Sequence, residues 1–466
     1  GYAAKAQTEG ARLSASEAFF EPEVLAMPET KLQQYFEKNK KLEQYKILLE
    51  RILRRKEHTL SANEEEIIAK TYEMSSAPDD IYSLFNNADA KFGTITDEEG
   101  NQVELTHGRY IKFMESKDRR VRKEAFTAMY HTYEQFKNTI AATFTANIKK
   151  AKFYADVKKY PSSLAAALDH GNIPVSVYDN LIDTVHRFLP SMYRYVNLRK
   201  RVLGVDELHM YDVYVPLVSD YEMEIPFEKA KEMVKEGLAP MGEEYLSHLQ
   251  EGFDNRWIDV YENQGKRSGA YSWAAYGTHP YVLLNYSGKL DDVFTLAHEM
   301  GHALHSYYSN QTQPYTYSNY LIFVAEVAST CNESLLMQHL LKNSKDKKEK
   351  AYLLNHFIDQ FKGTLFRQTM FAEFEKITHE MYAKGEALTA ESICEVYKTL
   401  NEKYFGDTMI SDPEIAYEWA RIPHFYTEFY VYQYATGFSC AIALSKRILE
   451  LGEEGVKDYM KFLTGG

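Results

Sequence analysis

The chain has 466 residues, 45% hydrophobic and 26% charged, which is the composition of a folded globular protein rather than a disordered one. Asp and Glu (67) outnumber Lys and Arg (54), and the resulting formal charge of −13 disfavours nucleic acid, whose binding requires neutralisation of phosphates. No apolar run is long enough to span a membrane, and three widely spaced cysteines, Cys331, Cys394 and Cys440, predict neither a disulfide framework nor a Cys-based zinc site, so we expect a cytoplasmic protein.

In chain order, the first feature is the N-terminus, Gly1-Tyr-Ala-Ala-Lys, which has no initiator Met and no apolar signal core. We therefore expect a processed or trimmed chain. Most of the chain is predicted to be helical, because Glu, Lys, Ala, Leu and Met recur with few glycines or prolines. The clearest predicted helical stretches are 30–55, 118–154, 226–250, 335–382 and 428–451.

Two short regions predict β-structure instead. Residues 92–105 alternate on both sides of a turn-rich centre, which is a hairpin pattern, and residues 257–288 contain two short apolar-aromatic runs bounded by Gly, Pro and Asn. We predict a mainly α protein with this small sheet next to a functional helix. The predicted domains are a helical N-terminal lobe over residues 1–200 and a catalytic lobe over residues 201–466.

The functional helix begins near Asp291 and carries His298-Glu-Met-Gly-His302. Two histidines four residues apart lie one turn apart, about 6 Å along the axis, so both imidazoles can reach one zinc ion. Glu299 lies next to the first histidine, where it can reach a water molecule on the metal. Apolar residues recur at spacings of three and four on the opposite face, at positions 293, 296, 300, 304 and 307. A second His-Glu pair, His379-Glu380, lacks the second histidine and is interpreted as surface helix.

A catalytic zinc site needs a third protein ligand and an open position. His305 lies further along the same straight helix, which makes it a poor third ligand and favours a packing role. Glu326 is the better candidate, because a lone carboxylate inside the apolar run Leu321-Ile-Phe-Val-Ala-Glu-Val-Ala is costly to bury without a cation. A buried salt bridge is the alternative. Glu333, two turns further on, is either a hydrogen-bond partner of a zinc-bound histidine or a solvated glutamate.

The pair His298-Glu-Met-Gly-His302 and Phe323-Val-Ala-Glu326-Val-Ala-Ser resembles the thimet-oligopeptidase superfamily of zinc peptidases, closest to the bacterial oligoendopeptidase F branch. Three further sequence segments, which begin at Tyr160, Lys266 and His424, support the assignment to that branch. The resemblance covers essentially the whole chain, although the chain starts late and stops early relative to the family. It implies a two-lobed helical shell around a deep substrate channel, with one Zn²⁺ per chain at its floor.

The resemblance also implies catalytic contacts from the tail that begins at His424. We predict Tyr432 as the donor to the oxyanion, His424 as a further catalytic contact, and Tyr430 and Tyr434 as substrate-binding residues. Gly269, Ala270 and Tyr271 are the predicted start of an edge strand that pairs with an extended peptide main chain. The predicted partners are short unfolded peptides, with no nucleic acid and no membrane, and no oligomeric state is predicted.

Three functions compete for this set of residues. The first is a zinc endopeptidase in which Glu299 takes a proton from the attacking water. The second is a zinc carboxypeptidase of a related helical fold, which would need a cationic clamp for the substrate carboxylate, such as Arg421. The third is an inactive zinc-bound peptide carrier, which has no need of Glu299. The ligand set favours zinc, although cobalt and manganese can occupy the same donors.

Overall fold

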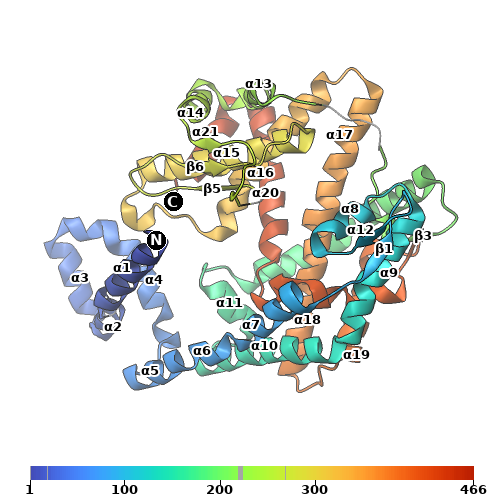
Figure 1. The fold of residues 1–466 in the computed structure, drawn as a ribbon. Coiled ribbons are helices and arrows are strands. Elements are labelled where there is room, and N and C mark those ends of the chain that lie inside the picture. Colours follow the sequence, from blue (N-terminus) through green and yellow to red (C-terminus); the bar gives the residue numbers. More distant parts are fainter. Residues whose placement is uncertain (1, 18, 219–223, 268, 466) are drawn as a thin grey trace. The chain divides into compact units, whose positions relative to one another are not determined.

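The computed structural model describes residues 2–17, 19–218, 224–267 and 269–465 (Figure 1). Its elements are predominantly α-helices, which confirms the mainly α prediction. Within these ranges no helix has both the length and the apolar character needed to cross a membrane. Contacts divide the chain into two compact units, Gly1–Ala77 with Lys150–Ala166, and Pro78–Lys149 with Ala167–Gly466. The boundary near residue 200, the two-lobed shell and the channel stay predictions.

The first unit is a set of short helices around a small core. Val24, Leu49 and Ile52 are buried at its centre. The predicted helix 30–55 is interrupted because Asn39 is extended and its side chain accepts a hydrogen bond from the backbone N–H of Lys41, an alternative to the helical bond. The elements are α1 (Tyr2–Glu17), α2 (Phe20–Ala26), α3 (Glu29–Lys38), η1 (Lys40–Tyr45), α4 (Lys46–Arg54), η2 (Arg55–His58), α5 (Ala62–Lys70) and α6 (Tyr72–Ser75).

Two helices, α10 (Lys137–Val157) and α11 (Ser163–Asp169), contribute residues to both units. The remaining helices belong to the second unit apart from the first residue of α7. They are α7 (Ala77–Leu84), α8 (His107–Met114), α9 (Arg119–Gln135), α12 (Val175–Leu203), α13 (Phe227–Gly237), α14 (Glu243–Asp254), α15 (Leu290–Thr312), α16 (Ile322–Asn343), α17 (Lys347–Gln360), α18 (Arg367–Ala383), α19 (Ala390–Phe405), α20 (Tyr432–Leu451) and α21 (Glu453–Leu463).

Short 3-10 and π segments join these helices. The predicted stretch 335–382 is divided by a π-helix, η7 (Phe361–Phe366), and the stretch 226–250 by a 3-10 turn, η5 (Ala239–Met241). A π-helix inside α-helical structure is uncommon and occurs frequently at functional sites. The other short segments are η3 (Phe85–Asp89), η4 (Met210–Asp212), η6 (Tyr315–Tyr317), η8 (Pro413–Arg421) and η9 (Pro423–Tyr426).

Both predicted β regions are confirmed. The hairpin consists of β1 (Thr94–Thr96) and β2 (Gln102–Glu104), which are antiparallel. The second region contributes β4 (Ile258–Asp259), β5 (Tyr271–Trp273) and β6 (Tyr281–Leu283) to a sheet of order β4-β6-β5, in which β5 is an edge strand. A further parallel pair, β3 (Leu208–His209) with β7 (Met409–Ile410), joins distant parts of the chain and was not predicted.

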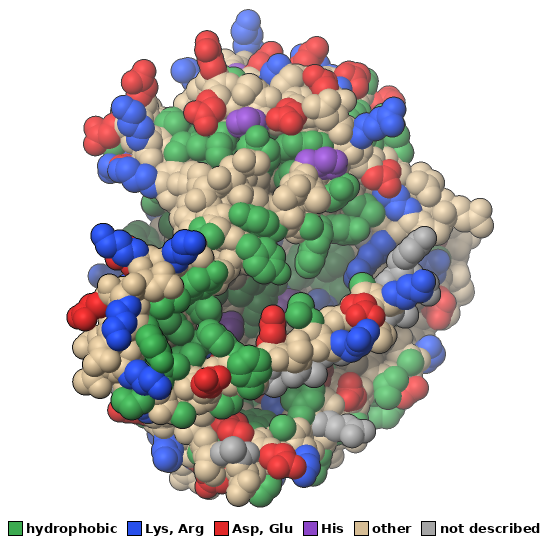
Figure 2. All heavy atoms as spheres, turned by 90° about the vertical axis from the view of Figure 1, so that its left-hand side faces the viewer, with side chains coloured by type: hydrophobic (Ala, Val, Ile, Leu, Met, Phe, Trp, Pro, Cys, Tyr) green, Lys and Arg blue, Asp and Glu red, His purple; other side chains and the backbone are tan. Residues whose placement is uncertain are grey.

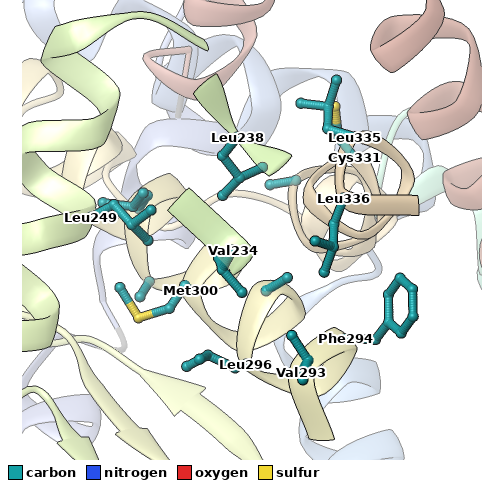
Figure 3. Packing of buried hydrophobic residues seen from close by; sticks show 14 of the residues in the cluster. Val234, Leu238, Leu249, Val293, Phe294, Leu296, Met300, Cys331, Leu335 and Leu336 are labelled. Carbon is teal, nitrogen blue, oxygen red and sulfur yellow. The ribbon is translucent and has the colours of Figure 1, made fainter. Parts of the chain in front are cut away.

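The core of the second unit surrounds α15 (Figure 3). Val293, Leu296, Met300 and Leu304 have no exposed surface, which confirms the predicted apolar face of this helix. They pack with side chains from α13, α14 and α16, among them Val234, Leu249 and Leu336. Helix α16 also packs closely against α20, and β5 and β6 lie against α15. Helix α15 is therefore packed against α16, and α16 in turn packs against α20.

Candidate metal centre

Helix α15 presents the His-Glu pair from a well-anchored start. The Asp292 carboxylate accepts hydrogen bonds from the backbone N–H groups of Ser287 and Lys289, and an acidic first turn suits the positive end of the helix. The rings of His298 and His302 lie on the same side, with centroids 4.8 Å apart. Both side chains are partly buried, so a ligand that binds between them is largely shielded from solvent.

Helix α16 brings a carboxylate to the two histidines. The Oε2 atom of Glu326 lies 3.4 Å from Nε2 of His298 and 3.6 Å from Nε2 of His302. The three side chains each place one donor atom within 4.8 Å of the others, and they are the single such group of three or more in the described ranges. Two imidazole nitrogens and one carboxylate oxygen are the protein ligands of many catalytic zinc sites, which keep the fourth position open.

Glu333 orients the first histidine. Its Oε1 atom is 2.6 Å from Nδ1 of His298, and its Oε2 atom accepts a hydrogen bond from Nε2 of Gln360 at 3.0 Å. A carboxylate on Nδ1 leaves Nε2 of the imidazole to face Glu326 and makes it a stronger donor to a metal. Of the two interpretations of Glu333 from sequence, hydrogen bonding to the histidine is therefore the one observed. Gln360 ends α17 and was not identified from sequence.

Burial and mutual charge set the pKa values of this group. Burial alone would lower the pKa of His298, but hydrogen bonds to Glu326 and Glu333 raise it to about 10. Burial and the charge of His298 lower the pKa of His302 to about 4. Burial would raise the pKa of Glu326, but its hydrogen bond to His298 and the charge of His302 lower it to about 2. A metal cation bound by these three side chains would compete with protons for the same donor atoms.

Glu299 lies next to His298 on α15, close enough for the charges of His298, Glu326 and Glu333 to act on it. It is 6% exposed, and its Oε2 atom has no hydrogen-bond partner in the part of the chain that the structure describes. Burial raises the pKa of Glu299 to about 7. A buried carboxylate oxygen without a donor is costly, and such atoms in native structures mark sites where a ligand or water is expected.

A cavity of about 220 Å³ opens beside the metal-binding group. Its lining comes from α15, α16, α17, η7 and α20, so the π-helix borders the candidate site. The lining residues are His298, Glu326, Thr330, Glu333, Gln360, Thr364, Tyr434 and Phe438. Thr364, in the π-helix, and Gln360, immediately before it, come from a segment whose residue pattern predicts only helix.

The predicted tail residues separate into two environments. Tyr434 lines the cavity, its hydroxyl is 3.2 Å from Nε2 of His424, and its ring centroid is 5.5 Å from that of Tyr430. Tyr432 is buried instead, with ring centroids 5.0 Å from Tyr178 and 6.0 Å from Phe323. Tyr430, His424 and Tyr434 therefore form one cluster, which borders the cavity through Tyr434, and Tyr432 points into the protein.

The predicted edge strand begins just after Gly269 and Ala270, at Tyr271. Gly269 has a positive φ of 85°, and its carbonyl accepts a hydrogen bond from Asn285 at 2.7 Å, which fixes the start of β5. On the outer face of this sheet Tyr271, Trp273 and Tyr281 are exposed. Figure 2 shows that hydrophobic side chains gather on one face of the molecule among charges of both signs.

Two other histidines of the sequence motifs lie in packed surroundings. His305 is 1% exposed and stacks on Tyr320 at a centroid distance of 3.7 Å, which confirms its packing role. His379 was interpreted as surface helix, and this is wrong, because it is 7% exposed and packs against the ring of Phe429 at 4.5 Å. The segment after His424 folds back onto α18 and covers this histidine.

Comparisons with known proteins cover nearly the whole chain. The family model described as "Peptidase family M3" matches residues 112–466, and that described as "Oligopeptidase F" matches residues 23–92. The chain is 52% identical to oligopeptidase PepF of Bacillus subtilis over 449 residues, which cover 96% of this chain and 67% of that protein. It is 46% identical to group B oligopeptidase PepB of Streptococcus agalactiae over 465 residues, which cover 100% of this chain and 77% of that protein. The crystal structure of oligoendopeptidase-F from Enterococcus faecium aligns with a TM-score of 0.81 and 42% identity over 99% of this chain and 78% of that one.

Proposed function

This chain belongs to peptidase family M3 and is a metallopeptidase, and from this premise we propose that it is a zinc endopeptidase that cleaves internal bonds of short unfolded peptides. One observation carries the proposal. His298, His302 and Glu326 converge from two helices, and Glu299 lies beside them with a carboxylate oxygen that has no hydrogen-bond partner among the described residues. A site built only to bind a metal has no use for that carboxylate.

The donors fit zinc. Two imidazoles and one carboxylate satisfy the preference of Zn²⁺ for nitrogen and oxygen ligands, and the carboxylate of Glu333 behind His298 is the usual support of a zinc-bound histidine. When bound, zinc supplies a Lewis acid and a water molecule whose pKa is near neutrality. Cobalt and manganese are the expected substitutes in vitro.

Glu299 is the proposed general base. It takes the proton of the attacking water and returns it to the leaving amine, which is the exchange that a carboxyl with a pKa near the working pH performs well. Burial at 6% exposure keeps bulk water away from this transfer. The carboxylate and the histidine ligands share one helix, so their spacing is set by the helix itself.

We assign the hydrogen bond to the substrate oxyanion to Tyr434 in place of Tyr432. The hydroxyl of Tyr434 borders the cavity with His298 and Glu326, whereas Tyr432 is buried against other aromatic rings. A donor aimed at the developing charge stabilises the transition state more than the ground state. His424 contacts that hydroxyl and orients it, and Tyr430 packs beside it as a substrate contact.

Substrate binding is proposed along the free edge of β5. An extended peptide that adds to this edge uses main-chain hydrogen bonds, which are blind to side chains, so broad sequence tolerance is expected. Gly269 and Ala270 would continue that edge beyond Tyr271. Three free cysteines are compatible with a reducing compartment, and we propose a cytoplasmic location.

The carboxypeptidase alternative has no observation in its favour. Arg421, the cation that it would use as a clamp, lies 4.9 Å over the ring of Tyr110 and does not line the cavity. Burial would lower the pKa of this guanidinium, but the surrounding Tyr130, Tyr110 and Glu418 raise it above its usual range. We therefore assign Arg421 a structural role.

The test is hydrolysis of an internally quenched peptide that is blocked at both ends, with zinc content measured for every variant. Glu299→Gln should lose at least a hundredfold in kcat with its zinc retained, because a general base contributes about 10²–10⁴-fold. Glu380→Gln, in the incomplete His-Glu pair on α18, is the matched control and should cleave as the wild type does. Trimming only of peptides with a free C-terminus would instead support a carboxypeptidase.

A further inference from the structure

A strained turn lies between the proposed contact residues of the tail. Phe429 has φ of +54°, a left-handed conformation that is a true outlier for a bulky aromatic residue. Such strain persists only where the surroundings hold it, and it gathers at functional sites. Phe429 stands between His424 and Tyr430, little more than one turn before Tyr434.

The surroundings of this turn are buried and specific. The backbone N–H of Phe429 donates to Oε1 of Glu375 at 2.9 Å, and the carbonyl of Phe425 accepts from Nδ2 of Asn147 at 3.2 Å. The ring of Phe429 packs against Tyr178 and His379, at centroid distances of 5.9 and 4.5 Å. Side chains from α10, α12 and α18 therefore contact both the backbone of residues 425–429 and the ring of Phe429.

Glu375 is a buried carboxyl that accepts the hydrogen bond from Phe429. It is 1% exposed, and its Oε2 atom lacks a hydrogen-bond partner among the residues that the structure describes. Burial raises the pKa of this carboxyl well above its usual range, and the nearby Glu428 adds to the effect. Glu373, on the same helix, differs because Lys403, His186 and Tyr404 bind both of its oxygens.

The turn leads directly into the helix that carries Tyr434. The N–H of Tyr430 donates to the carbonyl of Thr427 at 3.3 Å, and the N–H of Tyr434 donates to the carbonyl of Val431 at 3.2 Å. A change of φ at Phe429 would rotate Tyr430 and move the first turn of α20. Because hydrogen bonds weaken steeply with angle, a small movement of the Tyr434 hydroxyl would remove it from the oxyanion.

We propose that Glu375 is a positioning residue, which holds the left-handed turn at Phe429 and thereby sets His424, Tyr430 and Tyr434 at the cavity. The proposal rests on the proposed function, since it assigns to the tail a part in peptide cleavage. It requires only an acceptor at the position of Oε1, and no charge.

The experiment compares four variants by kcat, KM, zinc content and melting temperature on the blocked quenched peptide. Glu375→Met removes the acceptor and should lower kcat at least tenfold, with KM within threefold and zinc retained. Glu375→Gln keeps an acceptor of the same reach and should stay within threefold of wild-type kcat. Glu373→Met is the matched control, expected to lower the melting temperature while kcat stays within threefold.

Glu375→Asp, which is one methylene too short to reach Phe429, should behave as Glu375→Met does and carries the test if the Met variant does not fold. Amide exchange of residues 425–434 should rise at least tenfold in the Met or Asp variant but not in Glu375→Gln, whether or not the peptide is cleaved. Wild-type kcat in the Met or Asp variant, or equal losses of kcat in Glu373→Met, would overturn the proposal. If the wild type cleaves no peptide, the proposed function is refuted. The amide exchange rates of residues 425–434 would still test whether Glu375 holds the turn at Phe429.

Discussion

Replacing Gly301 with alanine should push apart the two helices that carry the candidate metal ligands. A Cβ built on Gly301 lies 2.6 Å from Cα of Ser329 and 2.8 Å from the carbonyl oxygen of Ala328. Carbon atoms prefer separations of about 3.5–4.0 Å, so α15 and α16 must move apart by roughly 1 Å. Gly301 lies one residue before His302, and Ser329 lies one turn after Glu326, so this movement separates the ligands.

Two opposing effects set the loss of stability. Overpacking of a tight contact costs about 1–3 kcal/mol, and alanine recovers about 1 kcal/mol of helix propensity over glycine. The net loss of stability is therefore about 1 kcal/mol. The effect on metal binding is larger, because ligand distances tolerate only about 0.2 Å. We expect the Kd for zinc to rise at least tenfold, which corresponds to about 1.4 kcal/mol.

Gly437 on α20 is the matched control. A Cβ at this position meets the Cβ of Glu326 at 3.5 Å, an ordinary van der Waals contact, so alanine should be tolerated and should favour the helix. Zinc affinity is measured by competition with a chromophoric chelator, and stability by thermal unfolding of the metal-free protein. If Gly301→Ala binds zinc as tightly as the wild type, or if Gly437→Ala loses as much zinc affinity as Gly301→Ala, then the close contact of α15 with α16 does not set the ligand distances.

Two further predictions concern carboxylates that are partly or fully buried. Glu333→Gln should weaken zinc binding by about 10–100-fold, because the neutral amide no longer supports His298, and unchanged chelator competition would contradict this. Burial would raise the pKa of Asp212, but hydrogen bonds from Arg119 and Arg122 lower this pKa in the folded protein. The ion pair therefore contributes its full stabilisation above the unfolded-state pKa of about 3.9, and this stabilisation is lost as the pH falls through the lower pKa of the folded state. Asp212→Asn should therefore lower the free energy of unfolding by about 3–5 kcal/mol at pH 7. Below pH 4 the urea unfolding curve of the variant should approach that of the wild type. A difference in unfolding free energy that stays constant at all pH values would argue against the pairing of Asp212 with the arginines.

The helix of the metal centre was predictable because its two faces differ in chemistry. Apolar residues at spacings of three and four define the buried side of α15, and His298 and His302 then fall on the other side. The position of Glu326 beside the two histidines was predictable for the opposite reason, since a carboxylate in an apolar run is costly to bury without a cation. In both cases the inference depends on a residue that violates its local pattern.

Other features depend on contacts that no local pattern contains. The π-helix Phe361–Phe366 lies in a sequence with good helix propensity, and propensity is a weak prior against tertiary packing. Gln360 has the local sequence of an exposed helix residue, and only the position of Glu333 across the cavity gives its amide a partner. The parallel pair β3–β7 is two residues long on each strand, too short for alternation to be visible.

The tail shows why the choice between Tyr432 and Tyr434 required the structure. Tyrosines at 430, 432 and 434 alternate as in a strand, and that spacing alone places all three on one face. Helix α20 begins at Tyr432, and the ring centroid of Tyr430 lies 5.5 Å from that of Tyr434, whereas Tyr432 is buried in the core. The turn at Phe429 precedes this helix, and the N–H of Phe429 donates to Glu375, which lies more than fifty positions earlier in the chain. The proposed oxyanion donor, Tyr434, is therefore distinguished from Tyr432 by contacts between distant parts of the chain, and sequence spacing cannot contain these contacts.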